Sequence, residues 1–343
     1  SAQGPVMTTL DFPQPQESVF AGSSSVCKGS ATRLYEWQLE ELLGSGAYAK
    51  VYKGKLQGSD TMVAIKVIDK SHQHASCALG EHAWRYREAL LRLDHPNTIA
   101  FFDFIEEERE LYVAMELCDG GDFFDFMCQL TSFTEADCAG WTKQVLTALA
   151  YVHGQGICHR DVKPENLRWS HEGEGAVLKL VDFGLATLDL EQRCLVEAEV
   201  VGTTLYAAPE VLDGSYNMQC DTWGVGVALV LLITGKFPFV FEGAHPVYRG
   251  KRYKLDDPAW EPVSPECRAM VLALLNPDPW TRVSPVEALA RRWTGLVQQV
   301  VVTHPTAERL ASLAVSRKQS CMGVDGTLWD VDGEEDGGDV YGA

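Results

Sequence analysis

Apolar residues recur along this chain with two different periods, and the shorter period comes first. Between residues 34 and 70, three short apolar runs separated by turn residues predict three strands. Apolar residues three and four positions apart predict a helix within 76–93. Two further strands are expected within 95–117, on either side of an acidic turn. The first third of the chain is therefore predicted to form a small β-rich lobe.

Helical spacing dominates the rest of the hydrophobic pattern. Segments 120–130 and 134–156 have apolar residues three and four positions apart, and Thr134 can cap the second of them. From about 217 to 300 the pattern again favours helices, and 303–320 has the spacing for one more. A β-rich part followed by a larger helical part predicts an α+β fold of two lobes.

The same pattern sets the expected domain boundaries. Residues 1–33 are rich in Ser, Gln, Gly and Pro and lack periodicity, which predicts a flexible N-terminal arm. Periodic segments run from 34 to 296, and we expect one two-lobed domain there, with the N-lobe at about 34–118 and the C-lobe at about 119–296. The remaining residues, 297–343, form a C-terminal extension.

The end of this extension is strongly acidic. Residues 325–343 hold seven Asp and Glu residues and no Lys or Arg, which predicts a solvated, disordered tail. They do not form a calcium-binding loop of the EF-hand type. If Asp330 is the first position, Glu335 stands where that loop needs glycine. We therefore expect no EF-hand in this chain.

Composition narrows the range of partners and compartments. The chain has 343 residues, of which 46% are hydrophobic, enough for a substantial core. Its net charge of −19 argues against a nucleic-acid partner, whose phosphates would repel it. The ten cysteines include no C-x-x-C pair, which favours a reducing compartment, the cytoplasm or the nucleus. The longest apolar run, near 225–233, is too short to span a membrane.

Two charged motifs of the helical part carry candidate chemistry. In "HRDVKPEN", Lys163 and Asn166 follow Asp161 by two and five residues, and Asp182 begins "DFG". Phosphoryl transfer needs a carboxylate to orient a hydroxyl nucleophile, oxygen ligands for Mg²⁺ and a cation beside the transferring group. Asp161 suits the first role and Lys163 the third. Asn166 and Asp182 supply the metal ligands, so we predict a phosphotransferase site.

A glycine-rich turn and a strand lysine precede these motifs. Gly44 and Gly46 lie between two predicted strands, where the backbone can approach phosphates closely, although an ordinary hairpin turn also explains them. Lys66 ends the apolar run "VAIK", from which an ammonium can reach a polyphosphate. A solvated lysine at a strand end is the alternative. The distance between the two features favours the phosphate-binding interpretation.

Taken in this order, the glycine turn, "VAIK", "HRDVKPEN", "DFG" and "APE" resemble the signature of eukaryotic protein kinases. The resemblance covers about 34–296, and Lys163 is typical of the serine/threonine branch. The stretches "LDHPN" and "GGDFFD" are most similar to the calcium/calmodulin-dependent group, which includes calcium-dependent kinases. The resemblance implies a two-lobed kinase fold with ATP and Mg²⁺ between the lobes. It also implies a pair between Glu210 of "APE" and Arg282.

The resemblance also implies which residues contact the nucleotide. They come from the glycine-rich turn, the first strands, the linker between the lobes and the catalytic motifs. The implied set is Gly44, Ser45, Gly46, Ala47, Ala49, Val51, Ala64, Lys66, Met115, Glu116, Cys118, Asp122, Asn166 and Asp182.

Substrate binding and activation are implied in the same way. Asp122 and Glu165 match family positions that receive an arginine upstream of the target residue, although both can be plain solvated carboxylates. Thr203 matches the threonine that braces the catalytic loop. Arg160 matches an arginine that pairs with a phosphate in the activation segment, and Glu199 stands at the expected phosphorylation site. We hypothesise that Glu199 replaces this phosphate.

The lysine's partner departs from the family pattern. In the family, a glutamate nine residues before the His of "HPN" pairs with the lysine of "VAIK". Counting back from His95 gives Tyr86, whereas Glu88 in "REALL" looks like the motif but lies two residues later. We assign the pair with Lys66 to Glu88, through a two-residue deletion. The alternative is that Tyr86 holds the place and the ion pair is absent.

Arg168 is a second departure, since an apolar residue normally lies under adenine two positions after the catalytic-loop Asn. A guanidinium there can extend away from the base or stack on it. In the C-terminal extension, Arg317 precedes Ser320 by three residues, the pattern a basophilic kinase prefers. The extension can therefore engage the cleft or a regulatory partner, although basic dipeptides are common on tails.

These observations predict transfer of the γ-phosphate of ATP to serine or threonine hydroxyls of protein substrates, with basic residues upstream of the target. The rival from another class is a pseudokinase, a scaffold that binds nucleotide or a partner without catalysis. A small-molecule phosphotransferase is disfavoured, because "GTTLYAAPE" resembles a peptide-docking segment that such enzymes lack.

Overall fold

The structure is a computed structural model of the whole chain. The predicted N-terminal arm, the predicted helix after residue 303 and the acidic tail lie outside the part that it describes. The described residues are 35–45, 49–56, 60–71, 83–130, 132–188, 195–196, 205–212, 215–239, 241–242, 245–246, 253–295 and 301–303.

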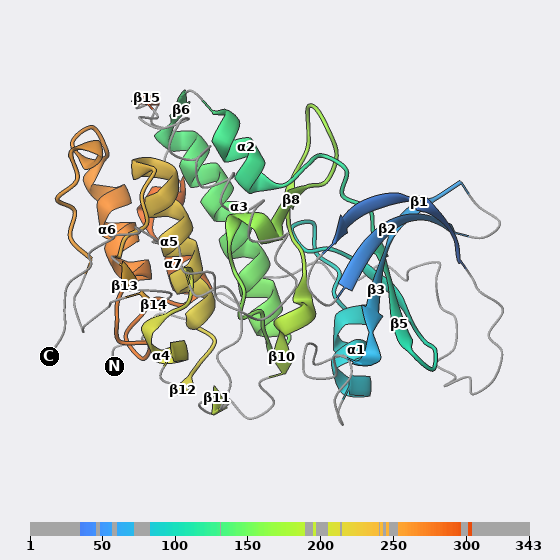
Figure 1. The fold of residues 1–343 in the computed structure, drawn as a ribbon. Helices are drawn as coiled ribbons and strands as arrows, with labels where there is room; N and C mark the ends of the chain where they lie inside the picture. The colour runs from blue at the N-terminus through green and yellow to red at the C-terminus, as the bar shows by residue number, and fades with distance from the viewer. Residues whose placement is uncertain are drawn as a thin grey trace, which may run out of the picture.

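One end of the molecule is a five-stranded antiparallel sheet with one helix against it (Figure 1). Successive residues of the third strand serve opposite faces of this sheet. Val63 and Ile65 pack with Tyr112 on one face, whereas Ala64 and Ile68 join the main core on the other. In the order in which they pair, the strands are β1 (Tyr35–Ser45), β2 (Ala49–Leu56), β3 (Met62–Asp69), β5 (Glu110–Glu116) and β4 (Phe101–Glu106), and the helix is α1 (Ala83–Leu91).

The other end is mainly helical (Figure 1). Its long helices, α3 (Glu135–Gly154) and α5 (Cys220–Thr234), pack against each other in the centre of the lobe. The remaining helices are α2 (Phe123–Gln129), α4 (Pro209–Leu212), α6 (Pro265–Leu274) and α7 (Pro285–Leu289), with 3₁₀ turns η3 (Pro164–Asn166), η4 (Phe183–Leu185), η5 (Pro258–Trp260) and η6 (Arg292–Gly295).

Short antiparallel strand pairs connect these helices. The two charged motifs flank the pair β8–β9, since residues 159–166 precede β8 and Asp182 follows β9. The pairs are β6 (Ser132–Thr134) with β15 (Val301–Thr303), β7 (Ile157–Cys158) with β10 (Thr187–Leu188), β8 (Leu167–Trp169) with β9 (Leu178–Leu180), β11 (Leu195–Val196) with β12 (Ser215–Tyr216), and β13 (Phe241–Glu242) with β14 (His245–Pro246).

Local sequence explains where the central helices begin and what they bury. Thr134 caps α3 as predicted, in a capping box with Asp137 that satisfies two backbone N–H groups. Helix α5 is apolar on nearly all sides, and Trp223, Val227 and Leu231 are fully buried. A helix apolar all round belongs in the interior, and α5 packs there against α3, α6 and η5. None of the helices in the described ranges is both long and apolar enough to cross a membrane.

The pair predicted between "APE" and the late arginine is confirmed. Glu210 accepts hydrogen bonds from both terminal nitrogens of Arg282, with an Nη2–Oε2 distance of 2.8 Å. Both side chains are buried, and the guanidinium lies 4.8 Å from the ring centre of Trp223. Arg282 also donates to the carbonyls of Gln219 and Asn276. This pair joins α4 to α5 and to the loop before α7.

We predict that Arg282→Ala destabilises the fold by about 3–5 kcal/mol, because Glu210 is left as an uncompensated buried charge. Urea denaturation at neutral pH measures this change. Arg291→Ala is the matched control, since Arg291 is exposed. A stability of Arg282→Ala equal to that of the control would contradict the role of the pair.

Candidate active site

The loop between β7 and β8 gathers three of the predicted residues around one carboxylate. Asp161 Oδ2 accepts hydrogen bonds from Lys163 Nζ at 2.7 Å and from Asn166 Nδ2 at 2.8 Å. Asn166 Nδ2 also donates to the backbone carbonyl of Asp161 at 2.7 Å. Pro164 begins η3 and fixes the turn between Lys163 and Asn166. The three side chains are therefore oriented by one another.

The second motif lies directly after β9, which pairs with β8. Val181 donates its N–H to the carbonyl of Asn166 at 2.9 Å, so the two motifs share one backbone ladder. Asp182 adopts a left-handed conformation with φ 57°, and its Oδ1 accepts the N–H of Gly184. Lys66 Nζ lies 2.6 Å from the same oxygen and lowers the pKa of Asp182 to about 2. Lys66 and Asp182, 116 residues apart in sequence, thus meet as an ion pair.

A buried carboxylate at the start of α5 holds the catalytic loop in place. Asp221 accepts the backbone N–H groups of His159 at 2.9 Å and Arg160 at 2.8 Å, and it lies 2.8 Å from Nε2 of His153. Arg160 needs this support because its φ of 66° is unfavourable for a residue with a Cβ atom. A Cβ at Gly224, one turn along α5, would lie 2.4 Å from the carbonyl oxygen of Val162. Both features bring the loop onto α5.

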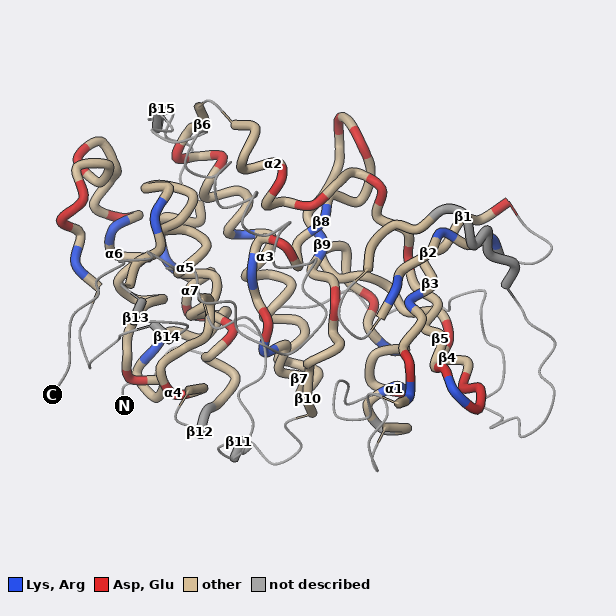
Figure 2. Tube along the Cα trace, in the orientation of Figure 1, with Lys and Arg blue, Asp and Glu red and all other residues tan. Residues whose placement is uncertain are grey.

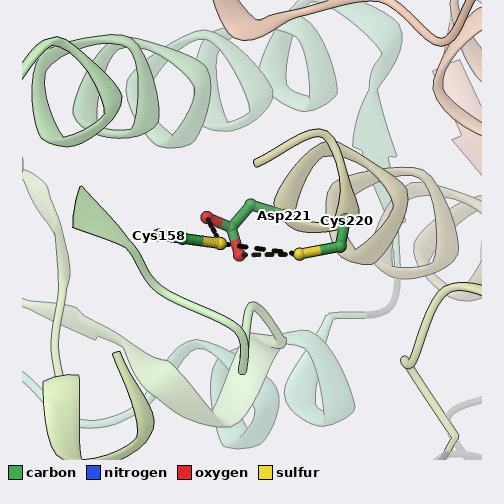
Figure 3. Close-up of side chains that lie close together, drawn as sticks. All are labelled: Cys158, Cys220 and Asp221. Carbon is green, nitrogen blue, oxygen red and sulfur yellow. Dashed lines mark hydrogen bonds between the residues drawn. The ribbon is translucent and has the colours of Figure 1, made fainter. Parts of the chain in front are cut away.

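Two thiols lie beside this carboxylate (Figure 3). Cys158 from β7 and Cys220 from α5 bring their Sγ atoms to 3.6 Å from each other. A hydrogen bond with Cys220 and burial raise the pKa of Cys158 well above its ordinary value, so this thiol is protonated. Both carboxylate oxygens of Asp221 already accept backbone N–H groups. The cluster therefore serves as a hydrogen-bonded anchor of the loop.

Most residues predicted to contact the nucleotide lie on the strands of the five-stranded sheet and in the linker between the lobes. Gly44 pairs with Val51 in the β1–β2 hairpin, and Ala64 pairs with Met115 between β3 and β5. Gly46 and Ala47 lie outside the described residues. Besides Lys66, Asn166 and Asp182, described above, the other predicted residues are Ser45 on β1, Ala49 on β2, Glu116 on β5, and Cys118 and Asp122 between β5 and α2.

Family comparison agrees with this architecture, since residues 37–294 match the family described as protein kinase domain. This chain belongs to the protein kinase family. It is similar to calcium/calmodulin-dependent protein kinase type 1B of Homo sapiens, with 35% identity over 261 residues that cover 75% of this chain and 74% of the relative.

Relatives from protists and plants show nearly the same identity. Calcium-dependent protein kinase 3 of Plasmodium yoelii yoelii is 34% identical over 263 residues, 74% of this chain and 47% of that protein. CDPK-related kinase 8 of Arabidopsis thaliana is 33% identical over 300 residues, 84% of this chain and 49% of that protein. The predicted resemblance to the calcium/calmodulin-dependent group is confirmed. This kinase chain spans about half the length of these two relatives.

The assignment of Glu88 as the partner of Lys66 is wrong in this structure. Glu88 is half exposed on α1 and pairs with Arg92 at 2.5 Å, one helical turn further on. Tyr86 faces inward instead, with 4% of its surface exposed, and its hydroxyl donates to the carbonyl of Phe183. The ungapped register thus holds, because turning Glu88 inward would expose Tyr86 and the buried Leu90.

Arg168 has a defined partner beside the expected adenine site. Its Nε donates to the carbonyl of Cys118 at 3.3 Å, and its backbone forms a bridge with Asp122. Sequence reasoning missed a second cation here. Lys179, three residues before Asp182, is buried and lies 3.0 Å from Glu116 in the linker. Two cations therefore contact the linker between the lobes, Lys179 at Glu116 and Arg168 at the carbonyl of Cys118.

The predicted substrate residues are only partly described. Asp122 caps α2 by accepting the N–H of Asp125 at 2.8 Å, and Glu165 lies in η3. Arg160 donates from Nε to the carbonyl of Leu185 at 2.5 Å, which ties the catalytic loop to η4. Thr203 and Glu199 lie outside the described residues, so their assignments remain predictions.

The donors present fit the group that the family implies. Asp182 is ionised, and Asn166 directs its Nδ2 to Asp161, which leaves its amide oxygen as an acceptor for a hard cation. Lys66 supplies a positive charge next to them. An amide oxygen, a carboxylate and an ammonium match the requirements of Mg²⁺ and a polyphosphate.

We predict that Asp221→Asn is less stable than the unmodified chain by about 2–3 kcal/mol at neutral pH, because hydrogen bonds to an ion are lost. Burial opposes ionisation of Asp221, but the bonds from His153 and the loop hold its pKa below the ordinary value. A lowered pKa adds stability above about pH 4 that is lost as the pH falls further. Urea denaturation from pH 7 to 3 should show the two chains converging. The exposed Asp60→Asn is the control, and parallel curves for Asp221→Asn would contradict the account.

Proposed function

We propose that this chain is a serine/threonine protein kinase that transfers the γ-phosphate of ATP to protein hydroxyls. The observation that carries the proposal is the cluster of Asp161, Lys163 and Asn166 beside the Lys66–Asp182 pair. Each charged group that phosphoryl transfer requires is present, and each is held by a neighbour. The lysine at 163 supports the serine/threonine branch. The relatives are named as calcium-dependent or calcium/calmodulin-dependent protein kinases, which supports a protein as the substrate.

The roles follow from the contacts. Asp161 orients the incoming hydroxyl and accepts its proton, and Lys163, already on Asp161, stabilises charge on the transferring phosphoryl group. Asn166 and Asp182 would hold Mg²⁺, which when bound neutralises the phosphate oxygens. Lys66 would bind the phosphates. The chain contributes mainly positioning and electrostatics, because no covalent intermediate is needed.

A basic peptide fits the face where the substrate would bind. Figure 2 shows acidic residues along the start of α2 and the β8–β9 connection, and the sequence there includes Asp122, Asp125, Glu172 and Glu174. Glu165 lies on the loop that carries Asp161. Opposite charge steers a cationic peptide toward such a face. We propose that an arginine upstream of the target hydroxyl binds at Asp122 and Glu165.

A nucleotide-binding pseudokinase is the rival function. The direct contact between Lys66 and Asp182 favours it. In this pair, the lysine is not free to bind phosphate and the aspartate is not free to bind the metal. Arg168 on the linker carbonyl also departs from the family. Asp161 weighs more heavily for catalysis, because binding of Mg²⁺·ATP alone would use Asn166 and Asp182 but not a carboxylate at 161.

Two further proposals concern the setting of the kinase. The cysteines without paired spacing fit a reducing compartment, so we place the protein in the cytoplasm or nucleus.

A regulatory partner would act through the C-terminal extension. Within the extension, the described residues 301–303 form β15, which pairs with β6 immediately before α3.

The decisive assay is transfer of ³²P from Mg²⁺·ATP to an Arg-x-x-Ser peptide. We expect transfer by the unmodified chain and a loss of about 10³-fold or more in Asp161→Asn, because the amide cannot accept the proton. A matched Ala-x-x-Ser peptide should react more slowly through a higher KM. Binding of nucleotide without transfer to any peptide would favour the pseudokinase, and equal use of both peptides would reject the arginine site.

Activation without phosphorylation is the second expectation. A fixed carboxylate at Glu199 would pair with Arg160 and replace a phosphate. Glu199→Ala should therefore lower kcat roughly tenfold, the effect of one charge-assisted hydrogen bond. Glu197→Ala is the matched control for loss of a nearby charge. Unchanged activity of Glu199→Ala would reject this proposal.

A further inference from the structure

The "DFG" turn is held in an unfavourable conformation by contacts from both lobes. Asp182 has a positive φ, a state that costs free energy for any residue with a Cβ atom. The ring of Phe183 packs edge-on against Phe101, at 5.7 Å, and His159, at 4.8 Å. The carbonyl of Phe183 accepts the hydroxyl of Tyr86 from α1. Neighbouring side chains thus hold both the ring and the carbonyl of Phe183.

Helix periodicity decides which α1 residue reaches this turn. Tyr86 and Leu90 are four residues apart and only 4% and 2% exposed, so they share the inner face. Glu88 and Arg92 share the outer face and pair there. Two positions along a helix correspond to a rotation of about 200°. Glu88 therefore cannot replace Tyr86 without exposing two large buried side chains.

Lys66 is oriented by Asp182 and not by a residue of α1. Among the residues that the structure describes, its ion-pair partner is Asp182, at 2.6 Å, and no carboxylate of α1 between 83 and 91 pairs with it. In this chain α1 therefore acts on the metal-binding aspartate through the next residue's carbonyl, and Asp182 in turn orients the lysine. Tyr86 has no carboxylate, so it cannot form with Lys66 the ion pair that a glutamate at this position would form.

We propose that Tyr86 is a positioning residue for Asp182, which links α1 to metal binding in place of a lysine–glutamate pair. This proposal rests on the proposed function, because it assigns Asp182 to Mg²⁺. Loss of the hydroxyl should free the Phe183 carbonyl and let Asp182 leave its strained conformation. Metal-dependent binding of ATP should then weaken, whereas contacts of ATP with the linker and Lys66 should persist.

The test is thermal unfolding of the full chain with ATP, with Mg²⁺ titrated in or with EDTA present. Tyr86→Phe keeps the buried ring and removes one hydroxyl. The Mg²⁺ concentration for half of the ATP-induced shift should rise roughly three- to tenfold, as expected for one buried hydrogen bond. The smaller shift in EDTA should not change. Tyr112→Phe is the matched control. Tyr112 is buried on the face of the sheet that points away from the main core, and its hydroxyl donates to the carboxylate of Glu110.

Glu88→Ala is the second variant and does not depend on how Tyr86→Phe folds. It should leave the Mg²⁺ dependence unchanged. An unchanged dependence in Tyr86→Phe, an equal loss of both shifts, or a raised Mg²⁺ requirement in Glu88→Ala would each overturn the proposal. If the unmodified chain binds Mg²⁺·ATP but transfers no phosphate, the proposed function fails while the role of Tyr86 can still be read. Absence of any Mg²⁺-dependent shift in the unmodified chain would reject both.

Discussion

The buried carboxylate of Asp221 is the interaction on which the site depends. A fully buried charge is tolerated only when hydrogen bonds satisfy it, and here the donors include two consecutive backbone N–H groups of the catalytic loop. The loop must pass over α5 with those groups turned toward it, so Arg160 adopts its left-handed conformation. Asp161 then follows at a fixed position, with Lys163 and Asn166 bound to it. The carboxylate of Asp221, at the start of the apolar helix α5, thus sets the geometry of the catalytic loop.

The same anchor extends to the other lobe through aromatic and backbone contacts. His159 contacts the ring of Phe183, and the carbonyl of Phe183 accepts the hydroxyl of Tyr86 on α1. In parallel, Lys66 on β3 pairs with Asp182. Both connections cross between lobes and end on the same three-residue turn. A movement of α1 relative to α5 should therefore displace Asp182, the residue that would hold the metal.

Much of this arrangement could be predicted from sequence because its parts are local motifs. The spacing of Asp161, Lys163 and Asn166 brings them together within one turn, and the capping box at Thr134 is a relation between near neighbours. The pairing of Glu210 with Arg282 spans 72 residues and was predicted only through the family resemblance. The β6–β15 pair and the Lys179–Glu116 contact lacked any such motif, because they depend on how distant segments pack.

The assignment of Glu88 shows why a motif can mislead when helix phase is ignored. "REALL" contains the expected letters, but burial is decided by which residues lie four apart, and Tyr86 and Leu90 meet that condition. The ungapped count from His95 had already pointed to Tyr86. Arg92 and Glu88 form an ion pair at the solvent-exposed surface of α1. Their charges therefore need no partner in the cleft.

A crystal structure with Mg²⁺ and a non-hydrolysable ATP analogue would show whether Tyr86 holds the turn that carries Asp182. We expect Mg²⁺ bound to Asp182 and Asn166, Lys66 moved from Asp182 to the phosphates, and the Tyr86 hydroxyl still donating to the carbonyl of Phe183. A structure in which α1 has rotated, with Glu88 on Lys66 and Tyr86 in solvent, would contradict this role of Tyr86.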